Sequence, residues 1–246
     1  ERWKNMAKIA LGQGKMVRRP VSGLLHIVVY VGFILINIEV LEIVIDGIFG
    51  THRIFSQVLP DSVYGFLIGN FEVLAFLVLV SVIIFWIRRN VIKIQRFWKD
   101  EMKGWPKSDG NMILYFEMIL MTLFLVMNAT DVHFQAMNTG NVISQFIEPL
   151  FSGLEDGTLH LIERGAWWLH IVGILIFLNY LYYSKHLHIL LAFPNTFFAN
   201  LKPKGQFTND TNVTKEVMMM MDPDADPYAM PEEGAEEEVS TFGAKD

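Results

Sequence analysis

The chain contains no cysteine. This absence excludes disulfide bonds, cysteine zinc sites and cysteine-ligated iron–sulfur clusters from these 246 residues. Charged residues are also sparse, at 19%, while 52% of the residues are hydrophobic. Soluble domains of this length seldom reach such an apolar composition. The composition therefore favours a membrane protein.

Four apolar segments are long enough to cross a bilayer, for which a helix needs about 20 residues. Inside lipid the backbone must satisfy its own hydrogen bonds, so segments of this kind form helices. We therefore predict an all-α integral membrane bundle with four transmembrane helices. The segments are residues 21–48, 64–87, 112–128 and 166–191.

Lys and Arg residues are distributed unevenly between the loops. Eighteen of the twenty lie before the first segment, between the second and the third, or near and beyond the end of the fourth. Only Arg53 and Arg164 lie on the other side. Because basic loops stay in the cytoplasm, we expect both termini to be cytoplasmic in a multi-pass protein of the inner (cytoplasmic) membrane.

The regions outside the spans differ in charge. Residues 1–20 are a basic lead-in, residues 21–200 hold the four-helix domain, and residues 201–246 are polar and acidic. The last region has the composition of a disordered cytoplasmic linker. Because the chain begins at Glu1 rather than methionine, we expect it to be a piece of a longer protein. We expect membrane lipid as a partner, and no nucleic acid.

Two of the seven histidines lie 18 residues apart on the fourth apolar segment. On one continuous helix this spacing makes about five turns, so His170 and His188 would share a face roughly 27 Å apart. That length is close to the ~30 Å hydrocarbon thickness. Ionisable residues at membrane depth are functional candidates, and this pair suits metal centres near both surfaces. His186 would point away from that face, and we interpret it as an interfacial residue.

His26 lies at the matching inner depth on the first segment. Two imidazoles on separate helices are what bis-histidine haem ligation requires. We therefore predict that His26 and His188 bind a haem iron near the cytoplasmic surface. At the outer end, His170 would pair with His133, with the loop residues His52 and His160 as weaker candidates. The other alternative is that no second haem binds. For any one histidine taken alone, the alternative is a neutral imidazole that hydrogen-bonds a neighbouring backbone carbonyl.

Glu39 and Glu42 lie on the outer half of the first segment. They are three residues apart and so are neighbours on one helix face. Buried carboxylates can relay the protons that quinone chemistry takes up or releases. The alternative is that they hydrogen-bond neighbouring helices.

The stretch WWLHIVGILIFLNYLYYSKHLHILLAFPNTFF contains His170, a Ser–Lys pair and His188. It resembles the last helix of the respiratory nitrate reductase gamma subunit, a membrane di-haem cytochrome b. It is more similar to the related membrane subunits of heterodisulfide-reductase-type complexes. In that family two histidines 18 residues apart close this helix, with a Ser–basic pair before the second. The stretch RRPVSGLLH, which ends at His26, is similar to the family's other ligand helix.

The resemblance covers about residues 14–200 and implies that His26 and His188 share the cytoplasm-proximal haem. The gamma subunit has a second histidine ten residues after the first, where this chain has Ile36, so an outer haem would need a different ligand. The resemblance also implies electron exchange with a membrane quinone. Some relatives join such a domain to cytosolic iron–sulfur modules through a polar tail, and we expect residues 201–246 to lead to one.

These patterns favour a haem b electron-transfer domain over two other classes of protein. The domain would be the membrane part of a quinone-linked oxidoreductase, passing electrons between the quinone pool and a cytosolic iron–sulfur or flavoprotein partner. A proton-conducting transporter would favour inverted repeats or Gly/Pro-broken helices, and neither is evident. A passive membrane anchor for a cytosolic enzyme would make the histidines incidental.

Overall fold

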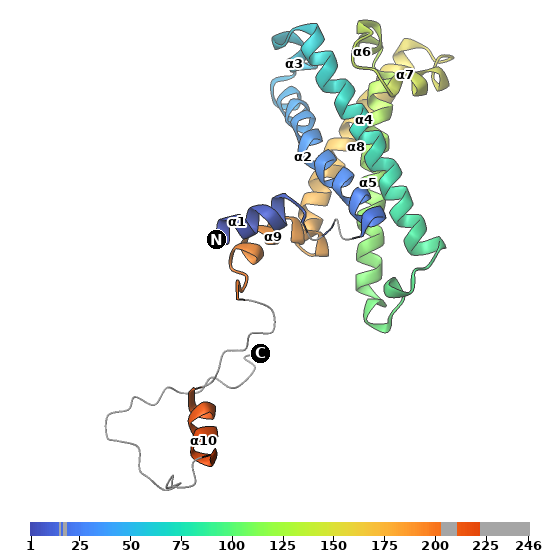
Figure 1. Cartoon of the computed structure of the whole chain (residues 1–246). Coiled ribbons are helices and arrows are strands. Elements are labelled where there is room, and N and C mark those ends of the chain that lie inside the picture. Colours follow the sequence, from blue (N-terminus) through green and yellow to red (C-terminus); the bar gives the residue numbers. More distant parts are fainter. Residues whose placement is uncertain (15, 17–18, 203–210, 222–246) are drawn as a thin grey trace. The chain divides into compact units, whose positions relative to one another are not determined.

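The computed structural model describes residues 1–14, 16, 19–202 and 211–221, and the regular elements within them are helices (Figure 1). In this part of the chain four helices are long and apolar enough to cross a membrane. The prediction of an all-α bundle with four such helices is therefore confirmed. They are α2 (Pro20–Phe49), α4 (Asp61–Trp86) with its continuation to Val91, α5 (Trp105–Thr130) and α8 (Asp156–Leu181).

The last two spans differ from their predicted bounds. Helix α5 begins at Trp105, directly after Gly104 with its positive φ of 74°, and Pro106 then lies in the first turn, where a missing N–H costs nothing. Helix α8 begins at Asp156, whose carboxylate favours the positive end of a helix, and it ends at Leu181. The fourth span is therefore displaced toward the N-terminus relative to the predicted 166–191.

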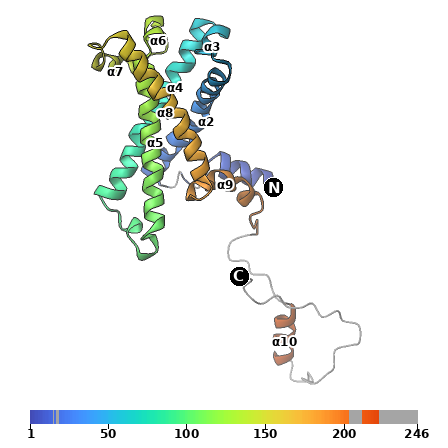
Figure 2. The same cartoon turned by 180° about the vertical axis from the view of Figure 1, so that it is seen from behind.

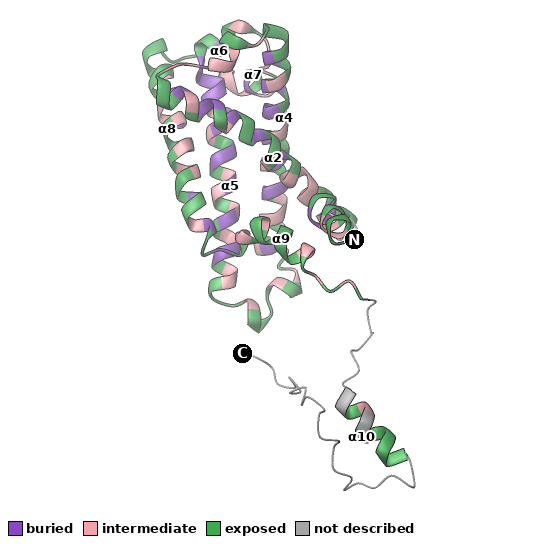
Figure 3. Ribbon diagram, turned by 90° about the vertical axis from the view of Figure 1, so that its left-hand side faces the viewer, coloured by how far each residue is buried: buried purple, intermediate pink, exposed green. Residues whose placement is uncertain are grey.

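The four long helices run up and down, and successive helices pack side by side (Figures 1 and 2). Helices α2 and α4 approach closely at Gly32, where a Cβ atom would lie only 2.5 Å from Val78 Cγ2. Phe71 and Phe124 are buried, whereas Phe66 and Leu169 are exposed. Figure 3 shows exposed residues along the outside of the long helices. Large apolar side chains on the outside are what a lipid-facing surface requires.

Short elements close the two ends of the bundle. One end, which we call the capped end, carries α3 (Ile54–Val58), α6 (Val132–Met137), α7 (Ser144–Ile147) and η6 (Glu148–Leu150). The other, which we call the basic end, contains Arg19, residues 87–107 and Lys185. Its short elements are α1 (Arg2–Met6), η1 (Ala7–Leu11), η3 (Ile87–Val91), η4 (Gln95–Phe97), η5 (Asp100–Met102), η7 (Lys185–Leu187) and α9 (His188–Phe197).

Residues 200–246 form a separate unit from residues 1–199. Within this unit the described residues 211–221 form helix α10 (Thr211–Met221), where the sequence predicts a disordered linker. The rest of that prediction, for residues 203–210 and 222–246, lies outside the described residues.

Candidate functional site

The chain turns sharply between His170 and His188. Helix α8 ends at Leu181, Ser184 is extended at φ −99° and ψ 152°, and α9 begins at His188. The side chain of Ser184 accepts a hydrogen bond from the His186 amide at 3.1 Å. The prediction of one continuous helix over residues 166–191 is therefore wrong. The shared-face argument and the ~27 Å separation do not apply to this pair.

A contact from another helix holds this turn. The buried carboxylate of Asp109, on α5, accepts hydrogen bonds from Tyr180 Oη at 2.7 Å and from the Lys185 amide at 3.1 Å. The Lys185 amide is one that an uninterrupted helix would have used internally. Because Asp109 satisfies it instead, the chain leaves the helical path without an unpaired buried group.

The turn brings His188 to the same cavity as His26. This cavity has a volume of about 540 Å³ and lies at the basic end between α2, α4, α5 and the segment after α8. His188 Nδ1 lies 3.0 Å from the carbonyl oxygen of Lys185. A carbonyl only accepts, so Nδ1 carries the hydrogen and Nε2 keeps its lone pair. His26 Nδ1 is buried and has no hydrogen-bond partner among the described residues.

His186 lines the same cavity, contrary to the prediction that it points away. Its ring lies 5.5 Å from that of His188 and 5.5 Å from that of Phe177. Burial, followed by the neighbouring imidazole of His188, lowers the pKa of His186 to about 4. The angular argument failed for this residue because it assumed a helix that ends before it.

The cationic groups of Arg89 and Lys185 lie beside Gly110 of α5 at the rim of the cavity. A Cβ atom on Gly110 would lie 2.6 Å from Lys185 Nζ and 2.8 Å from Arg89 Cζ. Both side chains hydrogen-bond the Pro106 carbonyl, at 3.1 Å and 3.2 Å, but Arg89 Nε is buried without a partner in the described structure. Burial and the charge of Arg89 lower the pKa of Lys185. The rim thus suits a ligand that carries carboxylates.

His170 lies in a different and smaller cavity, of about 140 Å³. Its Nδ1 is 3.0 Å from the Leu120 carbonyl, and the side chain is buried. Glu117 on α5 lines both this cavity and the larger one. The Glu117 carboxyl is buried, and no described residue hydrogen-bonds it. The structure therefore places His170 apart from the cavity that holds His26 and His188.

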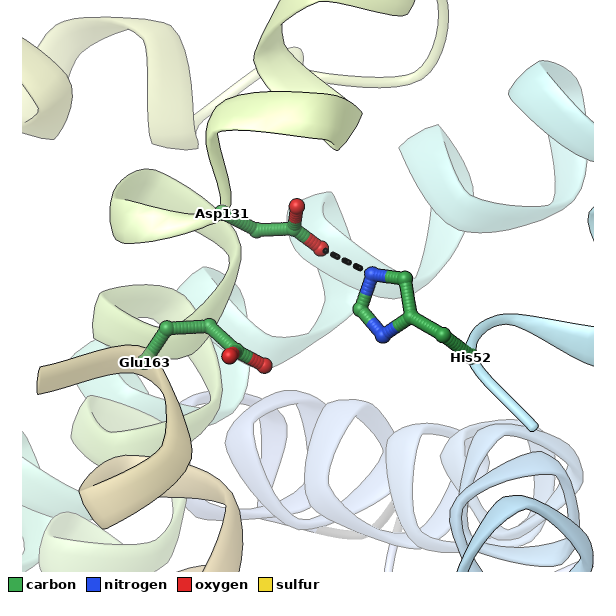
Figure 4. Close-up of side chains that lie close together, drawn as sticks. All are labelled: His52, Asp131 and Glu163. Atoms are coloured by element: carbon green, nitrogen blue, oxygen red, sulfur yellow. Dashed lines mark ion pairs between the residues drawn. The ribbon is translucent and has the colours of Figure 1, made fainter. Parts of the chain in front are cut away.

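His133 is exposed on α6 and lines a third cavity, of about 480 Å³, at the capped end. The structure does not bring His133 and His170 to one cavity. His52, Asp131 and Glu163 also line the third cavity, and their nearest ligand atoms lie within 4.8 Å of one another (Figure 4). The first two are joined at 3.3 Å. These are atom types that bind transition metals.

Arginines already pair with all three of these side chains. Arg53 Nε contacts Asp131 at 2.7 Å, while Arg164 contacts Glu163 at 2.9 Å and His52 Nδ1 at 2.8 Å. Burial raises the pKa of Asp131, but hydrogen bonding to His52 and the charge of Arg53 outweigh it and hold that pKa well below its usual range. The contacts explain the cluster as an ion-pair network.

Glu39 and Glu42 lie behind this network on α2, and both are buried. The Oε2 atom of each is buried without a hydrogen-bond partner in the described residues, while Glu42 Oε1 accepts the Phe55 amide at 2.8 Å. One turn further along α2, the Asp46 carboxylate accepts a hydrogen bond from the Arg53 backbone amide at 2.7 Å. Acidic side chains therefore extend from the middle of α2 to the cavity at the capped end.

Comparisons with known proteins identify two distant relatives. The chain is 27% identical over 217 residues to the probable iron-sulfur-binding oxidoreductase FadF of Bacillus subtilis strain 168. It is 22% identical over 209 residues to an EtfAB:quinone oxidoreductase of Syntrophomonas wolfei. These matches cover 85% and 80% of this chain but only 28% of each relative. No family model and no solved structure matches the chain.

Proposed function

We propose that this chain is the membrane part of a haem b electron-transfer protein, with His26 and His188 as the axial ligands of one haem at the basic end. The observation that carries the proposal is the convergence of imidazoles from α2 and α9 on one cavity of about 540 Å³. That volume falls within the range of about 300–1,000 Å³ typical of small-molecule sites. Haem b, when bound, supplies a one-electron carrier.

The residues around the cavity have complementary roles in this proposal. The Lys185 carbonyl orients His188 and fixes its tautomer, as second-shell acceptors do for metal-bound histidine. Arg89 and Lys185 would hold the propionates at the rim. Apolar side chains such as Ile113 and Leu114 line the interior and would pack against the porphyrin. We restrict the proposal to this haem because the cavity at His170 is about 140 Å³, below the range of about 300–1,000 Å³ typical of small-molecule sites.

We propose that the electrons pass between a membrane quinone and an iron–sulfur or flavin partner on the cytoplasmic side. The names of the two relatives support this, because one is an iron-sulfur-binding oxidoreductase and the other an EtfAB:quinone oxidoreductase. By the positive-inside rule the basic end would face the cytoplasm. A haem at that end lies beside the surface where a cytosolic partner would dock.

We also propose that Glu39 and Glu42 relay protons between the quinone and the capped end. Their unpartnered, buried Oε2 atoms support this role, because a carboxyl that is not held in an ion pair can change its protonation state. Replacing both by glutamine should slow quinol oxidation and leave the haem spectrum intact. The exposed Glu155, replaced by glutamine, is the matched control. A rate equal to that of the control would contradict the relay.

The haem proposal is tested by the visible spectrum and pyridine-haemochrome stoichiometry of the purified chain. We expect one haem b per chain, and its loss in both His26→Ala and His188→Ala. His160→Ala, an exposed histidine at the capped end, should keep the haem. Gel filtration of each variant separates lost binding from lost folding. Either ligand variant with an unchanged spectrum would refute the assigned pair.

A further inference from the structure

A second hollow lies at the basic end, between the start of α2 and the segment after α4. Its volume is about 370 Å³, and three arginines line it: Arg19, Arg88 and Arg96. Among the described residues, no acidic side chain lines the hollow. Within the described residues no carboxylate lies within ion-pairing distance of these three guanidinium groups. The hollow thus carries positive charge that the described chain does not neutralise.

The contacts that these arginines make leave their charge uncompensated. Arg88 Nη2 donates to Ser22 Oγ at 3.3 Å, and the Arg96 guanidinium lies 4.6 Å from the centre of the Phe97 ring. A hydroxyl and an aromatic ring hold a guanidinium in place without adding a negative charge. Three like charges around one hollow repel one another, so an anion bound between them gains from all three.

The position and the remaining walls indicate which anion fits. Arg19 directly precedes the first residue of the α2 span, and Arg88 lies in the last turns of the α4 span, so both are at headgroup depth. Val21, which is 59% exposed, and Ile94 form apolar walls beside the arginines. A phosphate next to apolar chain is the chemistry of a phospholipid, and guanidinium groups bind phosphate through paired hydrogen bonds.

We propose that this hollow binds the phosphate of an anionic phospholipid. Basic pockets between membrane helices recognise such headgroups. The hollow can be tested apart from the proposed haem site through Arg19, which lines this hollow and does not line the larger cavity. Arg88, Arg96 and Ser22 line both, so Arg19 is the residue that separates the two sites.

The experiment measures lipid retention by native mass spectrometry of the full chain from nanodiscs of phosphatidylcholine with or without phosphatidylglycerol. We expect wild-type chain to retain phosphatidylglycerol selectively. Arg19→Gln should weaken retention by about tenfold, since a charge-assisted hydrogen bond contributes at least that factor. Arg19→Gln combined with Arg88→Gln should abolish it. Lys99→Gln is the control, because that exposed lysine carries the same charge and does not line the hollow.

Three results would overturn the proposal. The first is equal retention of the two lipids by wild type. The second is retention by folded Arg19→Gln, checked by circular dichroism, that equals the Lys99→Gln value. The third result comes from a thermal-melting comparison in which inorganic phosphate is added to the phosphatidylcholine sample. If phosphate alone raises the melting temperature of the chain as much as phosphatidylglycerol does, the ligand is free phosphate and not a lipid.

Discussion

Both ends of the bundle contain arginines, but the two ends differ in whether a carboxylate of the chain neutralises the charge. At the capped end Arg53 and Arg164 each contact a carboxylate at under 3 Å. At the basic end Arg19 and Arg88 have no described carboxylate within reach, and Lys185 faces a cavity. A charge neutralised by its own chain stabilises the fold, whereas an uncompensated one is available to a ligand. The comparison therefore distinguishes an end where arginines are paired with carboxylates from the end where we propose that ligands bind.

The largest expected effect is on stability at the capped end. Arg53 is 6% exposed and contacts Asp131, Tyr64 and Asn128. Arg53→Met should cost about 3–5 kcal/mol of unfolding free energy, because removing one partner leaves buried carboxylates uncompensated. Arg164→Met should cost less than Arg53→Met, because the Arg164 side chain is 35% exposed, although its partner Glu163 is only 4% exposed. Denaturant unfolding in detergent measures the free energy of unfolding of both variants. Equal losses would contradict the conclusion that the buried Arg53 stabilises this end more than Arg164 does.

The next prediction sharpens the contrast at the basic end. Gly110→Ala places a Cβ atom against the ends of Lys185 and Arg89, which are flexible and can move aside. Alanine also favours a helix by about 1 kcal/mol over glycine, so the fold should be retained. Haem affinity should nevertheless fall by about tenfold through loss of a charge-assisted contact. Haem retention in a competition with apomyoglobin measures this.

Gly157→Ala is the matched control for that variant. It lies in the first turn of α8, and no described atom lies within 4 Å of an added Cβ, so the added methyl group does not touch the cavity. If both alanine variants keep the wild-type haem affinity, the two cations at Gly110 do not contribute to the site.

A smaller effect is expected from acid. The pKa of Asp131 is lowered in the folded chain, so its stabilising contribution is complete above the unfolded pKa of about 3.9 and is lost as the pH falls below that value. Stability attributable to this residue should be flat from pH 7 to about pH 5. It should then decline more steeply in wild type than in Asp131→Asn. Parallel acid profiles for the two proteins would show that the ion pair does not control this end.

The smallest effect belongs to an ion pair on the surface. Lys103 and Asp100 are paired at the basic end, and both side chains are largely exposed. Lys103→Ala should change the melting temperature too little to detect, because solvent screens such pairs. A clear loss of stability would mean that exposure does not set the value of a charge pair in this protein.

The sequence supported the membrane spans better than it supported the geometry of the histidines. Apolar runs predicted the four long helices because hydrophobicity is read within one window. The course of the chain after Leu181 depends on Asp109, which accepts a hydrogen bond from the Lys185 amide, 76 residues later in the sequence. A hydropathy window over the last span does not include Asp109, so the sequence around that span could not predict the turn. The placement of His186 failed for the same reason.

The capped end shows a similar division. Glu39 and Glu42 could be placed on one face of a helix from their spacing. The sequence could not predict that the Oε2 atom of each would have no hydrogen-bond partner among the described residues. That outcome depends on Arg53, which pairs instead with Asp131, 78 residues away. The signal for that pair was the rarity of basic residues on this side, which left Arg53 and Arg164 as its only Lys or Arg residues.

The sequence by itself determined that this chain forms apolar helices long enough to span lipid, and that its basic residues gather at one end. The helices follow from the local requirement that a backbone in lipid satisfy its own hydrogen bonds. The basic end follows from the positions of Lys and Arg in the loops between the apolar segments. The tertiary structure decided which imidazoles share a cavity and which charges are neutralised. Those outcomes depend on contacts between helices far apart in the chain, where one buried carboxylate redirects a backbone and another holds an arginine.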